Sequence, residues 1–368
     1  MIKVLSVFGT RPEAIKMAPV VEEMRRHPQT IESRVCVTAQ HREMLDQVLA
    51  LFEITPDDDL NVMQQNQTLA AATASILTRL DEVIAREQPD WVLAQGDTTT
   101  AMVATLAAFY RGAKVGHIEA GLRTFDKHQP FPEEINRKIA DAVCDLHFAP
   151  TETARANLLR EGVDAAGILV TGNTVIDALI EVAARPYDWA DGPLARVSRD
   201  RRIILVTAHR RENFGAPLRE ICAALKEIAA RPDVQIVYPV HLNPNVQTVV
   251  REMLGAEERI MLLDPLDYLP LVHLMKAATL VLTDSGGLQE EAPGLGKPVL
   301  VMRETTERPE GVEAGTVKLV GADRRRIVAE TGRLLDDVNE YERMAQAVNP
   351  YGDGHASERI VESLLAQR

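Results

Sequence analysis

Short apolar runs rich in β-branched residues alternate with longer amphipathic stretches along the whole chain. Continuous apolar strands separated by helices are typical of parallel sheets that are covered on both faces. The pattern therefore predicts a doubly wound α/β fold. The predicted strands are Ile2–Phe8, Arg34–Thr38, Asp90–Gln95, Lys114–Ile118 and Leu146–Ala149 in the first half, and Arg202–Thr207, Gln235–Pro239, Ile260–Leu263, Leu280–Thr283 and Val299–Met302 in the second.

A break in this periodicity lies near the middle of the chain, at Arg185–Asp200, which contains Pro186, Gly192 and Pro193. It predicts a boundary between two doubly wound halves. Ligands of such folds bind at the carboxyl ends of the strands. We therefore expect an active-site cleft between the halves, lined by the residues that follow each strand.

Composition and net charge limit the classes of molecule that the protein can bind. The 368 residues fit two domains, and an apolar content of 46% excludes disorder for most of the length. With 41 Lys and Arg against 54 Asp and Glu, the net charge is 41 − 54 = −13. This charge argues against nucleic-acid binding and against docking to an anionic membrane. It still allows a local pocket for an anionic small molecule.

Cysteine usage and hydropathy indicate the compartment. The three cysteines are scattered and no CxxC occurs, so neither a zinc ribbon nor a disulfide framework is indicated. The N-terminal apolar run is too short for a signal peptide, and no run reaches the ~18 residues of a membrane span. We expect a cytoplasmic protein.

The turn after the first predicted strand contains two basic residues. Thr10 and Glu13 have the spacing of a capping box, which by itself indicates only a well-capped helix. Arg11 and Lys16 would lie beside the start of that helix, where the helix dipole and free amides favour an anion. These two residues are candidates for contacts to a phosphate or a sugar.

Acidic residues follow the next predicted strands. Asp97 and Glu119 come after neighbouring strands, and Glu133 lies at the start of a predicted helix. Taken singly, each acid is more often structural; Glu133, for example, has the spacing of an ion pair with Arg137. Three acids at one sheet edge indicate a cluster in which proximity raises a pKa for general acid/base catalysis.

In the second half, His209 and His241 follow two successive strands. Viewed alone, His209 is as often an ordinary hydrogen-bonded loop residue as a functional one. HExxH is absent, so we expect no metal.

The strongest local motif is Ser285-Gly286-Gly287, which opens a predicted helix directly after an apolar strand. Two glycines can be a tight turn, but glycines at a helix start also let the backbone approach a phosphate. Arg303 and Arg308 follow the next strand and are a source of positive charge. Neither GxGxxG nor GxxxxGK[ST] is present, so no dinucleotide or Walker-type site is indicated. The residues together indicate an enzyme that acts on a nucleotide sugar.

Long strings in fixed order then extend this reading: VFGTRPEAIKMAP, TAQHREMLDQVL, QGDTTT, GHIEAGLRT, PEEINR, GNTVIDAL, TAHRRENFG and TDSGGLQEEAP. With them the chain strongly resembles the non-hydrolysing bacterial UDP-N-acetylglucosamine 2-epimerases. The resemblance implies two Rossmann-like domains in a glycosyltransferase-B-like arrangement with an interdomain active-site cleft. It implies domains of 1–171 and 172–353, with helix 354–368 completing the first, and a homodimer that needs no cofactor and no metal.

The reaction implied by the resemblance interconverts UDP-GlcNAc and UDP-ManNAc, supplying ManNAc units for cell-surface polysaccharide. UDP is eliminated to give 2-acetamidoglucal and is then added back, with a proton leaving one face of C2 and returning on the other. Two faces require two acid/base groups. The alternatives are a hydrolysing 2-epimerase that releases ManNAc and UDP, a glycosyltransferase of the same architecture, and a silent sugar-nucleotide sensor.

Three sets of site residues are implied. The catalytic set is Asp97, Glu119, Glu133 and His209. The substrate-binding set is Arg11, Lys16, Ser285, Gly286, Gly287, Glu291 and Arg308. A site for a second UDP-GlcNAc, acting as an allosteric activator, resembles Gln40, His41, Gln67, Arg210 and His241.

The chain departs from the family pattern at four positions. Gln95 stands where many relatives have histidine, and Leu271 stands where some place an aromatic residue near the uracil. Glu43 and Asn66 differ from residues found near the activator in some members. These departures leave the catalytic set intact.

Overall fold

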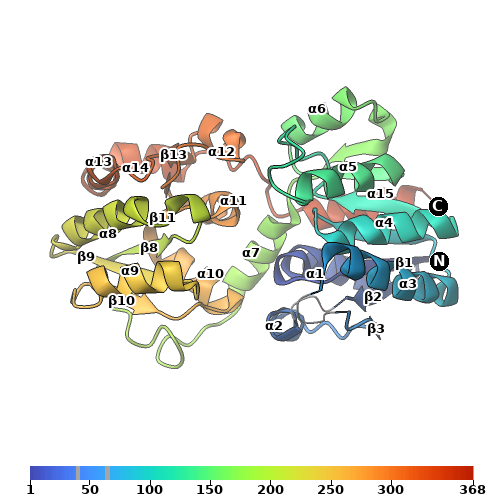
Figure 1. The fold of residues 1–368 in the computed structure, drawn as a ribbon, viewed down its shortest axis with the longest axis horizontal. Coiled ribbons are helices and arrows are strands. Elements are labelled where there is room, and N and C mark those ends of the chain that lie inside the picture. Colours follow the sequence, from blue (N-terminus) through green and yellow to red (C-terminus); the bar gives the residue numbers. More distant parts are fainter. Residues whose placement is uncertain (39–41, 63–66, 368) are drawn as a thin grey trace. The chain divides into compact units, whose positions relative to one another are not determined.

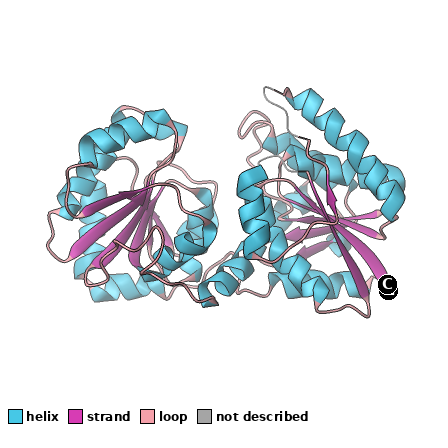
Figure 2. Cartoon of the chain, turned by 90° about the horizontal axis from the view of Figure 1, so that it is seen from below, coloured by secondary structure: helices cyan, strands magenta, loops and turns pink. Residues whose placement is uncertain are grey.

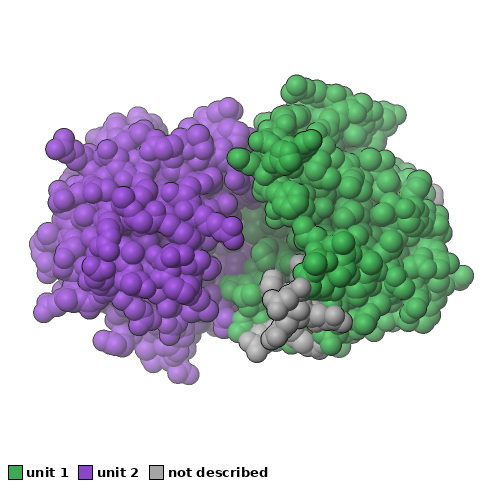
Figure 3. Space-filling view, in the orientation of Figure 1, with its two compact units in different colours: residues 1–178, 351–368 green, residues 179–350 purple. Residues whose placement is uncertain are grey.

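The computed structural model describes residues 1–38, 42–62 and 67–367. Its chain forms two compact units, which Figure 3 distinguishes by colour. Unit 1 comprises Met1–Ala178 together with Tyr351–Arg368, and unit 2 comprises Leu179–Pro350. The stretch 185–200, where the sequence pattern breaks, belongs to unit 2, and Leu194 and Val197 are buried there.

The sheet of unit 1 is parallel throughout, with the strand order β3-β2-β1-β4-β5-β6-β7. Helices cover both of its faces (Figure 2). The strands are β1 (Ile2–Phe8), β2 (Ile31–Val37), β3 (Asp58–Asp59), β4 (Trp91–Gln95), β5 (Lys114–Ile118), β6 (Leu146–Ala149) and β7 (Ile168–Val170). The helices are α1 (Arg11–Arg25), α2 (Arg42–Leu51), α3 (Leu69–Glu87), α4 (Thr99–Arg111), α5 (Glu133–Val143), α6 (Glu152–Arg160) and α15 (Ala356–Ala366), with a 3₁₀ turn η1 at Ala165–Gly167.

The C-terminal helix completes unit 1. Helix α15 packs against α1, at the other end of the sequence (Figure 1). Its first turn is held by Asp177, which lies in α7 (Thr174–Ala184). The Asp177 carboxylate accepts hydrogen bonds from the Ser357 amide at 2.7 Å, the Ser357 hydroxyl at 2.6 Å and the Ala356 amide at 3.3 Å.

The sheet of unit 2 is also parallel and has the order β10-β9-β8-β11-β12-β13. Its strands are β8 (Arg202–Thr207), β9 (Val234–Pro239), β10 (Ile260–Leu263), β11 (Ala278–Thr283), β12 (Val299–Val301) and β13 (Val317–Leu319). Its helices are α8 (Ala216–Ala229), α9 (Pro244–Leu254), α10 (Tyr268–Ala277), α11 (Gly286–Gly294), α12 (Pro309–Glu313), α13 (Arg324–Asp336) and α14 (Val338–Ala345), with a 3₁₀ turn η2 at Arg211–Asn213. The predicted doubly wound α/β fold is confirmed.

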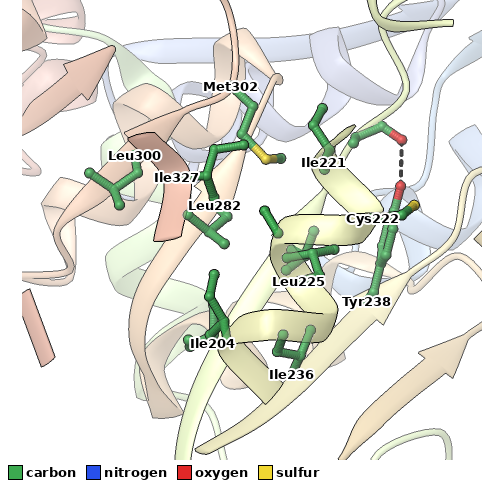
Figure 4. Packing of buried hydrophobic residues seen from close by; sticks show 14 of the residues in the cluster. Ile204, Ile221, Cys222, Leu225, Ile236, Tyr238, Leu282, Leu300, Met302 and Ile327 are labelled. Carbon is green, nitrogen blue, oxygen red and sulfur yellow. Dashed lines mark hydrogen bonds between the residues drawn. The ribbon is translucent and has the colours of Figure 1, made fainter. Parts of the chain in front are cut away.

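Each sheet contributes to a core of its own. In unit 2, apolar side chains of β8, β9 and β11 pack against α8, as the close view in Figure 4 shows for Ile204, Ile236 and Leu225. Tyr238 is fully buried in this core and donates a hydrogen bond from its hydroxyl to the Ala208 carbonyl at 2.8 Å. The core thereby fixes the residue that precedes His209.

The first turn of α1 confirms the predicted capping box of Thr10 and Glu13. Glu13 Oε2 accepts hydrogen bonds from the amides of Gly9 at 3.0 Å and Thr10 at 2.7 Å, and Oε1 accepts one from the Thr98 hydroxyl. Burial raises the pKa of Glu13 above its ordinary value. A Cβ at Gly9 would lie 1.9 Å from Thr38 Oγ1, so only glycine fits this turn. The residues around Arg11 are thus fixed at the carboxyl end of β1.

Within the described residues, none of the helices combines the length and the apolar character that crossing a bilayer requires.

Candidate active site

The three predicted acids of unit 1 lie at the carboxyl edge of its sheet and on the helix that borders it. Asp97 follows β4, Glu119 follows the neighbouring β5, and Glu133 is the first residue of α5. Helix α5 is bonded to the Asp97 turn: Arg137 donates to Asp97 Oδ2 from Nη2 at 2.6 Å and from Nε at 3.0 Å, and Asn136 Nδ2 donates to the Asp97 carbonyl at 2.9 Å. The Asp97 carboxylate is therefore paired with a guanidinium.

The structural role considered for Glu133, an ion pair with Arg137, is not what the structure shows. Arg137 binds Asp97 and, at 3.3 Å, Glu134, because both of these carboxylates lie closer to its guanidinium. Glu134 is itself fully buried and accepts hydrogen bonds from the Thr124 and Phe125 amides. Glu133 Oε2 is buried and accepts no hydrogen bond in the described part of the chain. Glu133 thus keeps a buried oxygen that is available to a ligand or a proton.

Glu119 is buried and surrounded by donors. Its Oε1 lies 2.5 Å from Lys16 Nζ and 2.9 Å from Asn173 Nδ2, and its Oε2 accepts a hydrogen bond from Gln95 Nε2. These three donors favour the ionised carboxylate. The backbone of Glu119 has a φ of 66°, a strained conformation for a residue with a Cβ, and such strain is found mainly at functional sites.

Two of these contacts bear on the expectations from the sequence. Lys16, expected to touch the substrate, forms an ion pair with Glu119 and so brings positive charge to the acid cluster. Gln95, which replaces the histidine of many relatives, is a direct partner of Glu119. Asn173 was not singled out from the sequence, although it lies in the GNTVIDAL string. Arg11, the first residue of α1, is half-buried at the carboxyl end of the neighbouring β1.

In unit 2, His209 is held by Asp284, which directly follows β11 and is fully buried. The Asp284 carboxylate lies 3.2 Å from His209 Nδ1 and accepts hydrogen bonds from the His209 amide, the Arg210 amide and Asn213 Nδ2 at 2.8 to 2.9 Å. Burial alone would raise the pKa of Asp284, but the hydrogen bonds from His209, Arg210 and Asn213 lower it below its ordinary value. Asp284 was not selected as a site residue from the sequence. Its position directly after a strand is the signal that could have identified it.

The rings of His209 and His241 are stacked, with centroids 5.4 Å apart and an interplanar angle of 15°. Burial and the charge of His209 lower the pKa of His241 below its ordinary value. The family resemblance implied two different sites for these histidines, a catalytic one and an allosteric one. The structure brings them into contact at the carboxyl ends of neighbouring strands β8 and β9.

The Ser-Gly-Gly motif opens α11 as predicted, with Ser285 at the N-cap position and making no side-chain capping bond. Neither Gly286 nor Gly287 has a left-handed φ. A Cβ would meet Arg210 Nη2 at 3.5 Å from Gly286, and Glu291 Oε2 at 3.4 Å from Gly287. Since neither backbone strain nor close packing demands glycine, the tight-turn reading lacks support. The Ser285 side chain thus leaves the first amides of α11 without a capping hydrogen bond.

The remaining substrate-binding candidates of unit 2 lie near α11. Glu291 is buried and accepts a hydrogen bond from the Tyr268 hydroxyl at 2.9 Å. Arg308 is ion-paired through Nε with Glu290. Arg303, expected to supply positive charge, is buried and paired with Glu212 at 2.5 Å, so this carboxylate offsets its charge.

The activator site implied by the resemblance is only partly described. Gln40 and His41, and also Asn66, lie outside the described residues. Gln67 Oε1 is buried without a hydrogen-bond partner in the described part of the chain. Arg210 Nη2 lies 3.8 Å from Glu307 Oε2. The activator site and the homodimer stay predictions.

A cavity of about 980 Å³ lies in unit 2, on the side of the edge strand β10. Its lining includes Val240 and Pro270, the residues that directly precede His241 and Leu271. None of the site residues expected from the sequence is among the described residues that line it.

Comparison with known proteins places this geometry in a family. A family model described as UDP-N-acetylglucosamine 2-epimerase matches residues 22–365. The UDP-N-acetylglucosamine 2-epimerase of Salmonella typhimurium is 58% identical over 373 residues, covering 100% of this chain and 99% of that protein.

Solved structures agree. One from Listeria monocytogenes matches with a TM-score of 0.94 and 51% identity, over 100% of this chain and 96% of that chain. The UDP-GlcNAc 2-epimerase of Neisseria meningitidis bound to UDP-GlcNAc matches with a TM-score of 0.89 and 50% identity, over 99% of this chain and 100% of that chain. The chain therefore belongs to the UDP-N-acetylglucosamine 2-epimerase family.

Proposed function

We propose that the protein interconverts UDP-GlcNAc and UDP-ManNAc without net hydrolysis and thereby supplies ManNAc units for polysaccharide synthesis. The observation that carries the proposal is the unequal bonding of the three acids at one sheet edge. Asp97 and Glu119 are paired with Arg137 and Lys16, whereas Glu133 keeps a buried oxygen without a partner in the described part of the chain. Carboxyl groups in such different environments suit opposite roles in proton transfer, one as the base and another as the acid.

The chemistry explains why several acids are needed. The C2 proton of the sugar has no neighbouring carbonyl to acidify it, so direct deprotonation is very slow. If the C1–O bond breaks first, UDP leaves with the bonding electrons and the oxocarbenium character of C1 acidifies C2. A base then takes the C2 proton to give 2-acetamidoglucal. Protonation of C2 on the opposite face and return of UDP to C1 complete the inversion, and each face requires its own group.

Unit 2 supplies the second half of the proposal. The N-terminus of α11, where Ser285 makes no capping bond, suits the diphosphate, because helix amides and the dipole stabilise negative charge there. His209, oriented by Asp284, would stabilise the leaving diphosphate or relay a proton. Glu291 suits a ribose hydroxyl, since a buried carboxylate accepts hydrogen bonds well. In the Neisseria relative, UDP-GlcNAc itself is the bound ligand.

The test is incubation of the purified protein with UDP-GlcNAc in deuterated water, followed by NMR. We expect UDP-ManNAc with deuterium at C2, without any added cofactor. Free ManNAc with UDP would instead identify the hydrolysing reaction. Transfer to an acceptor without exchange at C2 would identify a glycosyltransferase, and UDP binding without turnover would identify a sensor.

Asp97→Asn separates chemistry from binding in the same assay. Its matched control is Asp90→Asn, which makes the same change just before the other end of β4, where Asp90 accepts the Lys3 amide at 2.7 Å. We expect Asp97→Asn to lower deuterium incorporation by about 10²-fold or more while UDP binding is retained. Asp90→Asn should keep the wild-type rate. Wild-type turnover by Asp97→Asn would refute the role of Asp97.

A further inference from the structure

The fully buried side chain of His117 lies two residues before Glu119, in β5. Its Nδ1 lies 2.5 Å from Asp141 Oδ1 in α5, and its Nε2 lies 2.7 Å from the carbonyl oxygen of Gly96. Gly96 is the residue before Asp97. One ring therefore contacts the turn that carries Asp97 and the helix that begins at Glu133.

Both contacts require a proton on the ring. A backbone carbonyl only accepts hydrogen bonds, so Nε2 must donate to Gly96. Asp141 is kept ionised because its other oxygen accepts a hydrogen bond from Arg123 Nη2 at 2.6 Å, so Nδ1 must donate as well. A neutral imidazole has a single N–H. The geometry is therefore that of an imidazolium.

The charged groups around this ring form a network. Arg123 has a fully buried side chain and pairs with Asp141 and, at 2.7 Å, with Glu161, which also lies 3.4 Å from Lys138 Nζ. Burial would lower the pKa of His117, but the charge of Asp141 raises it above the ordinary value. Burial would raise the pKa of Asp141, but the charges of His117 and Arg123 lower it to about 2.

Other ionisable groups lie nearby. Cys144 and Asp145 follow Asp141 at the end of α5, and burial raises the pKa of the Cys144 thiol, which keeps it neutral. His147 is the register partner of His117 on β6. Its ring nitrogens lie 2.9 Å from the Asp141 carbonyl and 3.2 Å from the Gly167 carbonyl, and neither of these belongs to the turns that carry the acids.

The same network reaches the turn of Glu119. Asp141 Oδ2 accepts a long hydrogen bond from the Gly121 amide at 3.4 Å, and Arg123 Nη1 donates to the Leu122 carbonyl at 2.9 Å. Glu119 has a strained backbone, and such a conformation persists only where the surroundings hold it in place.

We propose that His117 is a positioning residue, a buried imidazolium that fixes the turns of Asp97 and Glu119 to each other and to helix α5. The proposal rests on the proposed function, because the acids it positions are those of the epimerisation. His117 touches no substrate atom in this role. It acts by holding the carboxylates in register, and small displacements of reacting groups lower rates steeply.

The protonation state is tested by NMR of the full-length protein labelled with ¹⁵N-histidine. We expect ring signals of a doubly protonated histidine at pH 8 that are absent from His117→Gln and present in His147→Gln. A His117 ring with a single proton at that pH would overturn the proposal. This readout does not depend on epimerase activity.

The effect on catalysis is tested with the same two variants. His117→Gln places an amide oxygen against Asp141, whereas His147→Gln makes the same change on the neighbouring strand away from the acids. We expect kcat to fall about 10²-fold in His117→Gln, with KM and the UDP dissociation constant changed less than about threefold. His147→Gln should lose thermal stability but keep kcat within about threefold.

The double variant His117→Gln/Asp141→Asn keeps the result interpretable if the single variant is poorly folded. The introduced asparagine can donate from its amide to the side-chain oxygen of the introduced glutamine, so an amide pair replaces the ion pair. We therefore expect at least a tenfold recovery of kcat relative to His117→Gln. Equal kcat values in His117→Gln and His147→Gln would overturn the positioning role while the proposed function stands. A wild-type protein that does not epimerise would instead refute the proposed function and leave the NMR result intact.

Discussion

Single residues at this site owe their chemical state to the partners that the fold gives them. Glu119 and Glu133 are the same residue type, yet the first meets three donors and the second keeps a bare oxygen in the described part of the chain. The sequence predicted both because each follows a strand or starts a helix. It did not predict Asp284 or Asn173 as site residues, since a polar residue after a strand is as often a simple turn residue.

The first prediction concerns Asp284→Asn. The substituted amide would present donors to the His209 and Arg210 amides, so the loop that carries His209 should shift. We expect kcat to fall about 10²-fold with a smaller change in UDP affinity, measured by the epimerase assay and by calorimetry. Asp264→Asn, at an exposed carboxylate of the same unit, serves as the control and should match wild type.

The contribution of Asp284 to folding stability depends on pH in a defined direction. Because the folded pKa of Asp284 is lowered, its ionised form stabilises the fold above the unfolded pKa of ~3.9, and the stabilisation is lost as pH falls through the folded value. The difference in urea midpoint between wild type and Asp284→Asn should be full at pH 7 and shrink below about pH 4. A constant difference across this range would contradict the ionised role of Asp284.

The sequence predicted the positions of most strands, but it predicted their first and last residues less well. Strands β1, β5, β6, β8 and β10 have the predicted bounds. Strand β2 begins at Ile31, whereas the prediction began at Arg34. The prediction missed the start because Glu32 and Arg34 are at partly exposed positions and interrupt the apolar pattern. Strands β3, β7 and β13, which have two or three residues each, were not predicted. Each of these three lies at the edge of its sheet.

The element-scale prediction is Gly286→Ala at the start of α11. A methyl group there has room in the protein itself, so folding stability should stay equal or rise by up to ~1 kcal/mol. UDP affinity should fall at least tenfold, because the methyl group would occupy the space of a phosphate oxygen.

The control for this change is Gly332→Ala inside α13, where an added Cβ meets nothing within 4 Å. It should give a similar gain in stability, measured by thermal unfolding, and leave UDP affinity unchanged. Unchanged UDP affinity in Gly286→Ala would show that the glycine is not part of a phosphate site.

At the scale of the whole molecule, the net charge of −13 opposes an anionic substrate. Each unit has local groups that oppose this charge: Lys16 and Arg11 in unit 1, and the helix N-terminus of α11 in unit 2. The chain also completes unit 1 with its last residues, so the stability of that unit depends on contacts between the two ends of the sequence.

The whole-molecule prediction tests this dependence with Asp177→Ala. Loss of the carboxylate leaves the first amides of α15 without their acceptor and should cost ~1–2 kcal/mol. We expect faster hydrogen exchange in α15 and α1, with unchanged exchange in β8 and α8 of unit 2. Asp323→Ala removes the cap of α13 in unit 2. It should speed hydrogen exchange in β8 and α8 and leave exchange in α15 and α1 unchanged. Equal acceleration in both units would contradict two separate cores.

The sequence by itself determined the parallel α/β class, most strand positions and the strand ends that carry chemistry. These features depend on local periodicity, which burial of one face or both imposes on neighbouring residues. Only the tertiary structure decided which polar groups are partners: His117 with Asp141, and His209 with Asp284, 75 positions further on. The protonation state of a buried group depends on charges and donors within a few ångströms, and the fold collects these from distant parts of the chain.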